Sequence, residues 1–348
     1  MTAVAWSASM RSAQRSTKAA RTEQRSDPWI SAIAIGTFVI GSAIWIARKG
    51  LFIHADTVVL WVLAGLFALT LTDLSRWGLR LLVDWLPLAF LLIFYEQSAP
   101  LVKLLKTPIH VLLQVKFDRL VFGKPILTVQ FQHLLGQTQT VRWFDYPMWA
   151  IYMTHFFMAL VIAGYLWRFS YSRFRPFRTQ IVILTAFGFV TYILFPAAPP
   201  WYVADRLHEL PWIYRSVFDT WGRLGLHTAG SIVDGAIDGN DLGNQFAAVP
   251  SMHAAVSLFV ACFFWRTARP WLRVVLVVYV LGMAFTLVAS GEHYAFDIFL
   301  GWFYAVAVVS GAALIGRRRR ARSARRAGHA RRDPEISSPA NAPPVPAA

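Results

Sequence analysis

The chain has 348 residues, of which 56% are hydrophobic, and its formal net charge is +16. Length alone would allow two soluble domains, but this apolar content, with 15 Trp and 26 Phe, is typical of a polytopic membrane protein. The single cysteine, Cys262, excludes an intramolecular disulfide and a cysteine-rich metal site.

Apolar runs of about twenty residues recur along the chain, each long enough to cross the ~30 Å hydrocarbon core of a bilayer. They lack the alternation of outer-membrane strands, so we expect an all-α fold, a polytopic transmembrane helical bundle of about six to eight helices. The third and the last predicted helices are the least regular. The predicted membrane helices cover residues 30–48, 57–74, 79–98, 147–167, 179–197, 251–267, 271–290 and 297–315.

These helices divide the chain into four parts. Residues 1–28 form a basic N-terminal tail, and residues 29–146 contain the first membrane helices and a polar outer segment. Residues 147–316 hold the remaining membrane helices, and residues 317–348 form a tail that is basic and then Pro/Ala-rich, which predicts disorder. The N-terminal tail lacks an apolar core with a cleavage site, so the first membrane helix is expected to act as an uncleaved insertion signal.

The basic charge fits membrane topology better than nucleic-acid binding. With both termini in the cytoplasm, 23 of the 34 Lys and Arg residues lie on the inner side, as the positive-inside rule requires. The outer segment 99–146 is the weak point, because it holds six of the other eleven. We therefore expect no nucleic-acid partner. The Arg- and Ala-rich composition indicates a high-GC genome, so the predicted location is a bacterial plasma membrane.

Three segments with polar residues are predicted to meet on the outer face. They are YILFPAAPPW (192–201), NQFAAVPSMH (244–253) and SGEHYAFDIFLGW (290–302). The helix that ends in the first segment is followed by one predicted helix that returns across the membrane and one that crosses outward again. The predicted number of helices therefore places all three segments at the same face of the membrane.

The second segment has the pattern of a helix start. Pro250 suits a helix entry and Ser251 is a natural N-cap. His253 would then lie in the first turn, where free N–H groups and the helix dipole favour an anion such as phosphate. Taken alone, this pattern fits equally well a histidine that hydrogen-bonds a loop carbonyl.

The third segment places His293 and Asp297 four residues apart, on one face of a helix. A carboxylate on one imidazole nitrogen fixes the tautomer and makes the other nitrogen a better nucleophile. The alternative is a pair that only anchors the loop. Together with His253, these residues also resemble a facial metal triad. Since they supply one acid, one nucleophile and one orienting group, as phosphate chemistry needs, we expect no metal and no cofactor.

PSMH followed by HxxxD resembles the second and third motifs of the type 2 phosphatidic acid phosphatase superfamily. FPAAPPW and NQFAAVPSMHAA resemble more specifically the fungal inositol phosphorylceramide synthase branch and its bacterial relatives. The similarity spans residues 150–315, with a weaker match at DRLVFGKP (118–125). The resemblance implies that residues 147–316 form a phosphatase-like catalytic membrane core.

The resemblance also implies roles for single residues. His293 becomes a phosphohistidine, Asp297 orients it, and His253 protonates the leaving oxygen. Ser251 helps to hold the phosphate oxygens, and the proline-rich motif either shapes the lipid entrance or is a structural elbow. The implied substrate-binding residues are Ser251, Pro250, Arg206, Pro199, Pro200 and Trp201.

Two departures from the phosphatase pattern concern cations. The first phosphatase motif, Lys-x6-Arg-Pro, has a counterpart in RFSYSRFRP (168–176), but the predicted topology puts that loop on the opposite side of the membrane. The Arg expected six residues before His293 is Leu287. A clamping cation must therefore come from elsewhere. The candidates are Arg206 and Arg215, or Lys103, Lys106, Arg119, Lys124 and Arg142 in the upstream outer segment.

These observations predict a membrane phosphotransferase that takes a phospholipid substrate and an alcohol or water acceptor. The missing cations and FPAAPPW favour a synthase that uses phosphatidylinositol, and a lipid-phosphate phosphatase is the alternative. A non-enzymatic transporter or scaffold is a third possibility, against which the clustering of polar residues at one interface argues. Asp84 and His155, inside predicted membrane helices, are expected to pair within the bundle.

Overall fold

The computed structural model describes residues 28–49, 55–71, 74–96, 98–137, 140–224 and 245–332. Over these ranges the chain is a helical bundle without named strands, which confirms the predicted fold class. Among the described residues, β-type pairing consists of two isolated bridges, which join His110 to Ala197 and Ala197 to Ala247. Most of the predicted N-terminal tail, the end of the C-terminal tail and residues 225–244 lie outside the described residues.

Each of the predicted membrane helices corresponds to a helix of the structure. Four of them, α8, α9, α14 and α15, are long and apolar enough to cross a membrane, and shorter apolar stretches lie in α2, α3 and α13. The chain is therefore an integral membrane protein. The helices are α2 (Pro28–Lys49), α3 (Ala55–Thr70), α4 (Leu74–Glu96), α8 (Asp145–Phe169), α9 (Tyr171–Leu194), α13 (Met252–Phe264), α14 (Pro270–Ala289) and α15 (Ala295–Arg332).

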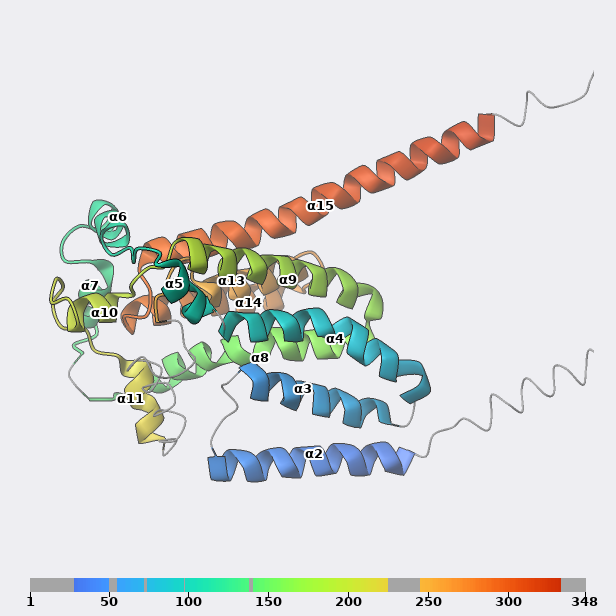
Figure 1. Cartoon of the computed structure of the whole chain (residues 1–348), viewed down its shortest axis with the longest axis horizontal. Coiled ribbons are helices and arrows are strands. Elements are labelled where there is room, and N and C mark those ends of the chain that lie inside the picture. The colour runs from blue at the N-terminus through green and yellow to red at the C-terminus, as the bar shows by residue number, and fades with distance from the viewer. Residues whose placement is uncertain are drawn as a thin grey trace, which may run out of the picture.

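Short helices form in the polar segments, where the sequence pattern predicted none. In Figure 1, α6, α7, α10 and α11 gather at one end of the bundle, whereas α2 starts and α15 ends at the other. This arrangement separates the polar segments from both ends of the described chain. The short helices are α5 (Ser98–Leu105), α6 (Leu112–Phe122), α7 (Leu127–Leu134), α10 (Pro200–Asp205) and α11 (Ser216–Arg223).

Helix α13 lies at the centre of the bundle and packs most extensively on α15. Its side chains Ala254, Ala255 and Phe259 are fully buried. The two helices approach to backbone contact at Gly301, where an added Cβ would lie 2.4 Å from the carbonyl oxygen of Ser251. Small residues thus bring the starts of α13 and α15 together, as in other tightly packed membrane helices.

The predicted basic loop RFSYSRFRP is helical except for Ser170, with its other residues at the end of α8 and the start of α9, and it lies at the far end of α13. Arg173 donates a hydrogen bond to Thr267 (2.8 Å), beyond the C-terminus of that helix, and Phe177 packs on Phe263. Because α13 has 13 residues and rises ~1.5 Å per residue, about 20 Å separates this loop from Ser251. The loop is therefore no phosphate clamp for the residues at the start of α13.

The position of Asp84 agrees with the prediction, whereas the length of α15 does not. Asp84 pairs inside the bundle as predicted, with Arg178 and with the indole N–H of Trp167 (3.0 Å). Helix α15 extends beyond the predicted end at residue 315 and includes the arginine-rich stretch up to Arg332. Arginine is a good helix former, so the apolar span continues as a helix into its basic flank.

Candidate active site

Backbone hydrogen bonds join the three segments that were predicted to meet. The N–H of Ala197 donates to Phe246 (2.8 Å), which links the first segment to the second. The N–H of Trp201 donates to Gly291 (3.1 Å), which links the first to the third. The N–H of Ser251 donates to Asp297 (2.9 Å) and closes the triangle. The predicted convergence is confirmed.

The turn before α15 holds His293 in place. The N–H groups of Glu292 and His293 both donate to the carbonyl of Leu287, at 3.0 and 3.1 Å. Gly291 has a φ of +74°, and an added Cβ would lie 2.3 Å from Ile213 Cγ2. Both the left-handed backbone and the close approach therefore require glycine at this position.

Asp297 lies next to the imidazole of His293. Its Oδ2 is 3.4 Å from His293 Nδ1 and accepts a hydrogen bond from the N–H of Tyr294 at 2.9 Å. The carboxylate is fully buried, so these neighbours fix its orientation. When Nδ1 of His293 carries the proton, Nε2 has a free lone pair.

His253 lies in the first turn of α13, and Ser251 is its N-cap as predicted. The Ser251 hydroxyl accepts a hydrogen bond from the N–H of Ala254 at 3.4 Å. The ring of His253 is 5.9 Å from the ring of His293, measured between centroids, and the two planes are tilted by 57°. The buried Nε2 of His253 has no hydrogen-bond partner among the described residues.

A third imidazole, that of His155, belongs to the same group. Its ring stacks on His253 with a centroid distance of 3.9 Å, and Tyr152 stacks on His253 at 4.6 Å. The Nδ1 of His155 is buried and has no partner within the described chain. A single histidine inside an apolar run has no signature of its own, so its contact with His253 was not predictable from the sequence.

Asp118 of α6 is the second residue that the sequence did not reveal. Its carboxylate accepts the N–H groups of Ala295 and Phe296, both at 3.4 Å, and so caps the first turn of α15. Desolvation of this buried group, with a smaller contribution from Asp297, raises its pKa from 3.8 to about 7. It lies in DRLVFGKP, the weaker of the quoted sequence matches.

Arg215 is a basic residue that the structure brings beside the His293 turn. Its guanidinium forms an ion pair with Glu292 (Nε to Oε1, 3.1 Å) and lies between the rings of Trp201 and Phe218, at 4.0 and 3.7 Å from their centroids. Cation–π contacts of this kind fix the direction of an arginine side chain. Arg206, by contrast, is half exposed and pairs with Asp205 at the end of α10.

The three prolines that were predicted to bind substrate lie at the starts of helices α10 and α13. Pro199 caps α10, Pro200 is its first residue, and both are buried with Trp201. The carbonyl of Pro250 accepts a hydrogen bond from the hydroxyl of Tyr192 at 2.9 Å. Among the upstream candidate cations, Lys103, Lys106, Arg119 and Lys124 have exposed side chains, and Arg142 donates to the carbonyl of Leu135 (3.2 Å).

The chemistry that this group of residues supports is phosphoryl or acyl transfer. Within the described ranges, no group of three or more His, Cys, Asp and Glu side chains has the arrangement of a metal site. The histidines instead offer one nitrogen oriented by a carboxylate and a second imidazole within the span of one tetrahedral group.

The family model of the PAP2 superfamily matches residues 125–311, which is more than half of the chain. The protein belongs to this superfamily. It is therefore a membrane enzyme of the phosphatase or phosphotransferase type that handles lipid phosphates. The match covers His155, His253, His293, Asp297 and Arg215 and begins after Asp118.

A curated relative is the phosphoinositol dihydroceramide synthase of Bacteroides thetaiotaomicron. It is 31% identical over 130 residues, which are 36% of this chain. The matched part spans 41% of the relative, so less than half of that protein is compared. No solved structure matches the chain.

Proposed function

We propose that this protein is a phosphotransferase that moves an inositol-phosphate type headgroup from a phospholipid to a lipid or sugar alcohol, through a phosphohistidine at His293. The observation that carries the proposal is the pair of imidazoles 5.9 Å apart, of which one has Asp297 at its Nδ1. A phosphoryl group between them is within reach of a nucleophile on one side and an acid on the other.

The reaction then has two balanced steps. His293 Nε2 attacks phosphorus, an N–P bond forms, and the P–O bond to the donor lipid breaks while His253 gives its proton to the leaving oxygen. In the second step His253 takes the proton of the acceptor hydroxyl, that oxygen attacks phosphorus, and the N–P bond breaks. Asp297 stabilises the positive charge on His293 in both steps.

Several nearby groups support the binding of an anion. The N-terminus of α13, capped by Ser251, favours negative charge, and Arg215 places a cation beside the His293 turn through its ion pair with Glu292. Pro199, Pro200 and Trp201 position this arginine, and Pro250 orients the start of α13. Arg206, from its more exposed position, is assigned to the approach of the headgroup.

Two observations favour transfer to an alcohol over hydrolysis. The relative from Bacteroides thetaiotaomicron is called a synthase, and the FPAAPPW motif replaces the cationic first motif of the phosphatases. A lipid-phosphate phosphatase of the same superfamily, in which water attacks the phosphohistidine, is the second candidate. The distribution of Lys and Arg supports a site on the outer face of a bacterial plasma membrane, with both termini in the cytoplasm.

The decisive experiment uses purified protein in mixed micelles with inositol-labelled phosphatidylinositol and a ceramide or diacylglycerol acceptor. We expect the label to move into the acceptor lipid. Release of the label into water alone, as inositol phosphate, would show hydrolysis and reject the synthase. Without acceptor, His293 of the wild type should carry the labelled inositol phosphate through an acid-labile N–P bond.

His293→Ala separates enzyme from transporter or scaffold. We expect it to lose lipid turnover completely, whereas His133→Ala, a change at an exposed histidine of α7, should retain it. Survival of turnover in His293→Ala would refute the assignment of the nucleophile.

A further inference from the structure

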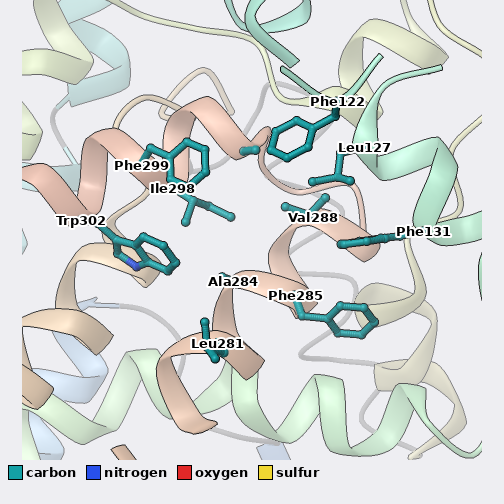
Figure 2. A pocket seen from close by; sticks show the side chains of 11 residues that line it. Phe122, Leu127, Phe131, Leu281, Ala284, Phe285, Val288, Ile298, Phe299 and Trp302 are labelled. Carbon is teal, nitrogen blue, oxygen red and sulfur yellow. The ribbon is translucent and has the colours of Figure 1, made fainter. Parts of the chain in front are cut away.

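An apolar groove lies beside the turn that carries His293. Its volume is about 270 Å³, and it is bounded by α6 and α7 on one side and by α14 and α15 on the other (Figure 2). All of the residues that line it are hydrocarbon or aromatic. They are Phe122, Leu127, Phe131, Leu281, Ala284, Phe285, Val288, Ala295, Ile298, Phe299 and Trp302.

The groove wall packs directly on the residues that hold the histidines. Ala295 and Ile298 are in the first turn of α15, on either side of Asp297 in the sequence. Val288 and Ile298 form one buried cluster with Ala254, the neighbour of His253. The residues at the start of α15 therefore contribute both to the wall of the groove and to the support of the two imidazoles. Ala254 of α13 packs against the same wall.

Aromatic pairs join the helices across the groove. Phe131 of α7 contacts Phe285 of α14, with ring centroids 5.2 Å apart, and Phe117 of α6 contacts Phe299 of α15 at 6.2 Å. Phe285 and Phe299 are 37% and 44% exposed, so the groove opens to the outside of the bundle. In a membrane protein, that outside is hydrocarbon.

The short helices that bound the groove are apolar on their outer surface as well. Leu120 of α6 is 85% exposed and Leu134 of α7 is 80% exposed. Both leucines belong to helices that also line the groove. Such surfaces are stable where lipid replaces water, at the boundary between headgroups and acyl chains. With the short helices at that boundary, a lipid that places its phosphate at the histidines would place its chains beside the groove.

We propose that the groove binds one hydrocarbon chain of the donor lipid while the phosphate of the same lipid lies between His253 and His293. This assignment rests on the proposed function and adds how the donor is selected. A volume of about 270 Å³ accommodates roughly nine methylene groups if each takes about 30 Å³. Since burial of a methylene contributes about fourfold in affinity, chain length should affect the KM of the donor strongly.

Ala284→Phe tests the proposal, because it fills the groove from α14 without touching the histidines. The matched control is Val274→Phe on the same helix, at a residue that is 62% exposed and not part of the groove. Initial rates are measured in mixed micelles with dipalmitoyl and dihexanoyl phosphatidylinositol. We expect Ala284→Phe to raise the KM for the dipalmitoyl donor about tenfold more than the KM for the dihexanoyl donor. Val274→Phe should change neither KM.

Equal changes for both donors, or equal effects of both variants, would overturn the proposal. If Ala284→Phe does not fold, Phe285→Ala, which enlarges the groove, replaces it and should shift the preference towards bulkier chains. A change of oligomeric state with unchanged chain-length preference would identify the groove as an interface between copies of the chain.

A second measurement does not depend on turnover. The His293→Ala variant is incubated with a phospholipid that carries a photoactivatable group on one acyl chain, and the labelled peptides are identified by mass spectrometry. Labelling of Leu281 to Val288 and of α7 supports the groove even if the wild type transfers no headgroup. Labelling spread over the lipid-facing surface would refute it. Failure of the proposed function and failure of the groove are thus distinguished.

Discussion

The carboxylate of Asp118 provides a specific test of how the start of α15 is held. It accepts the N–H groups of Ala295 and Phe296, which follow His293 by two and three residues. Burial raises its pKa from 3.8 to about 7, and repulsion from Asp297 adds to the shift, although the two hydrogen bonds oppose it. We therefore expect Asp118→Asn to change stability and activity in opposite directions.

The effect on stability follows from proton linkage. The folded protein keeps the Asp118 proton up to about pH 7, whereas the unfolded chain releases it near pH 3.8. The stability that this proton contributes is complete below the unfolded pKa and is lost as the pH rises through the folded pKa. A shift of about three pKa units corresponds to at most ~4 kcal/mol. Asparagine does not titrate and avoids this loss.

The effect on activity follows from the number of acceptors. The ionised carboxylate accepts two N–H groups, but an amide oxygen accepts them more weakly, and the loss of one such bond costs about 1 to 2 kcal/mol. If the start of α15 positions His293 and Asp297, a loss of ~1.4 kcal/mol lowers kcat about tenfold. In the wild type, ionisation of Asp118 should add a rise in kcat near pH 7 that the variant lacks.

The assay compares melting temperature and initial rate in detergent at about pH 4 and about pH 8. Asp118→Asn should melt like the wild type at the lower pH and above it at the higher pH, with reduced kcat. Glu209→Gln, at an exposed carboxylate, is the control and should change neither quantity. Equal destabilisation at both pH values would show that the pKa reasoning is wrong. An unchanged kcat would refute the positioning role.

Three further changes test other parts of the site. Gly301→Ala places a Cβ 2.4 Å from the Ser251 carbonyl oxygen, so it should separate α13 from α15 and lower kcat at least tenfold. Gly311→Ala, in open space on α15, is the control and should leave kcat unchanged. Arg215→Lys keeps the charge but loses the planar contacts, and we expect a KM for the lipid phosphate raised about tenfold; an unchanged KM would exclude a role as clamp. His155→Phe keeps the stacking on His253, so activity equal to wild type would show that only the ring shape of His155 matters.

The large features of the fold were predictable because they are local. Runs of apolar residues predicted the membrane helices, and Pro250 with Ser251 predicted where α13 begins. The spacing of the helices then brought the three polar segments to one end, and the hydrogen bond from Ser251 to Asp297 agrees with that. Each of these inferences needs only neighbouring residues and a count of membrane crossings.

The missing features depend on contacts between distant parts of the chain. Asp118 is 177 residues from Ala295, and no local pattern in α6 indicates that its carboxylate caps another helix. His155 is a single histidine in a mostly apolar run, so the sequence could not distinguish pairing within the bundle from contact with His253. The short helices α6 and α7 have only 11 and 8 residues, too few for a reliable periodicity.

The position of Arg215 accounts for the absence of a cation before His293. Leu287, where the phosphatase pattern expects Arg, is fully buried in a cluster with Met283 and Ala254, and a charge there would lack a partner. Arg215 reaches the same turn from another segment, because Trp201 lies under its guanidinium and donates its backbone N–H to Gly291. On this basis we propose that FPAAPPW positions the guanidinium of Arg215. A change at Trp201 should therefore weaken phosphate binding to the same degree as a change at Arg215, and the two changes together should cost little more than either alone.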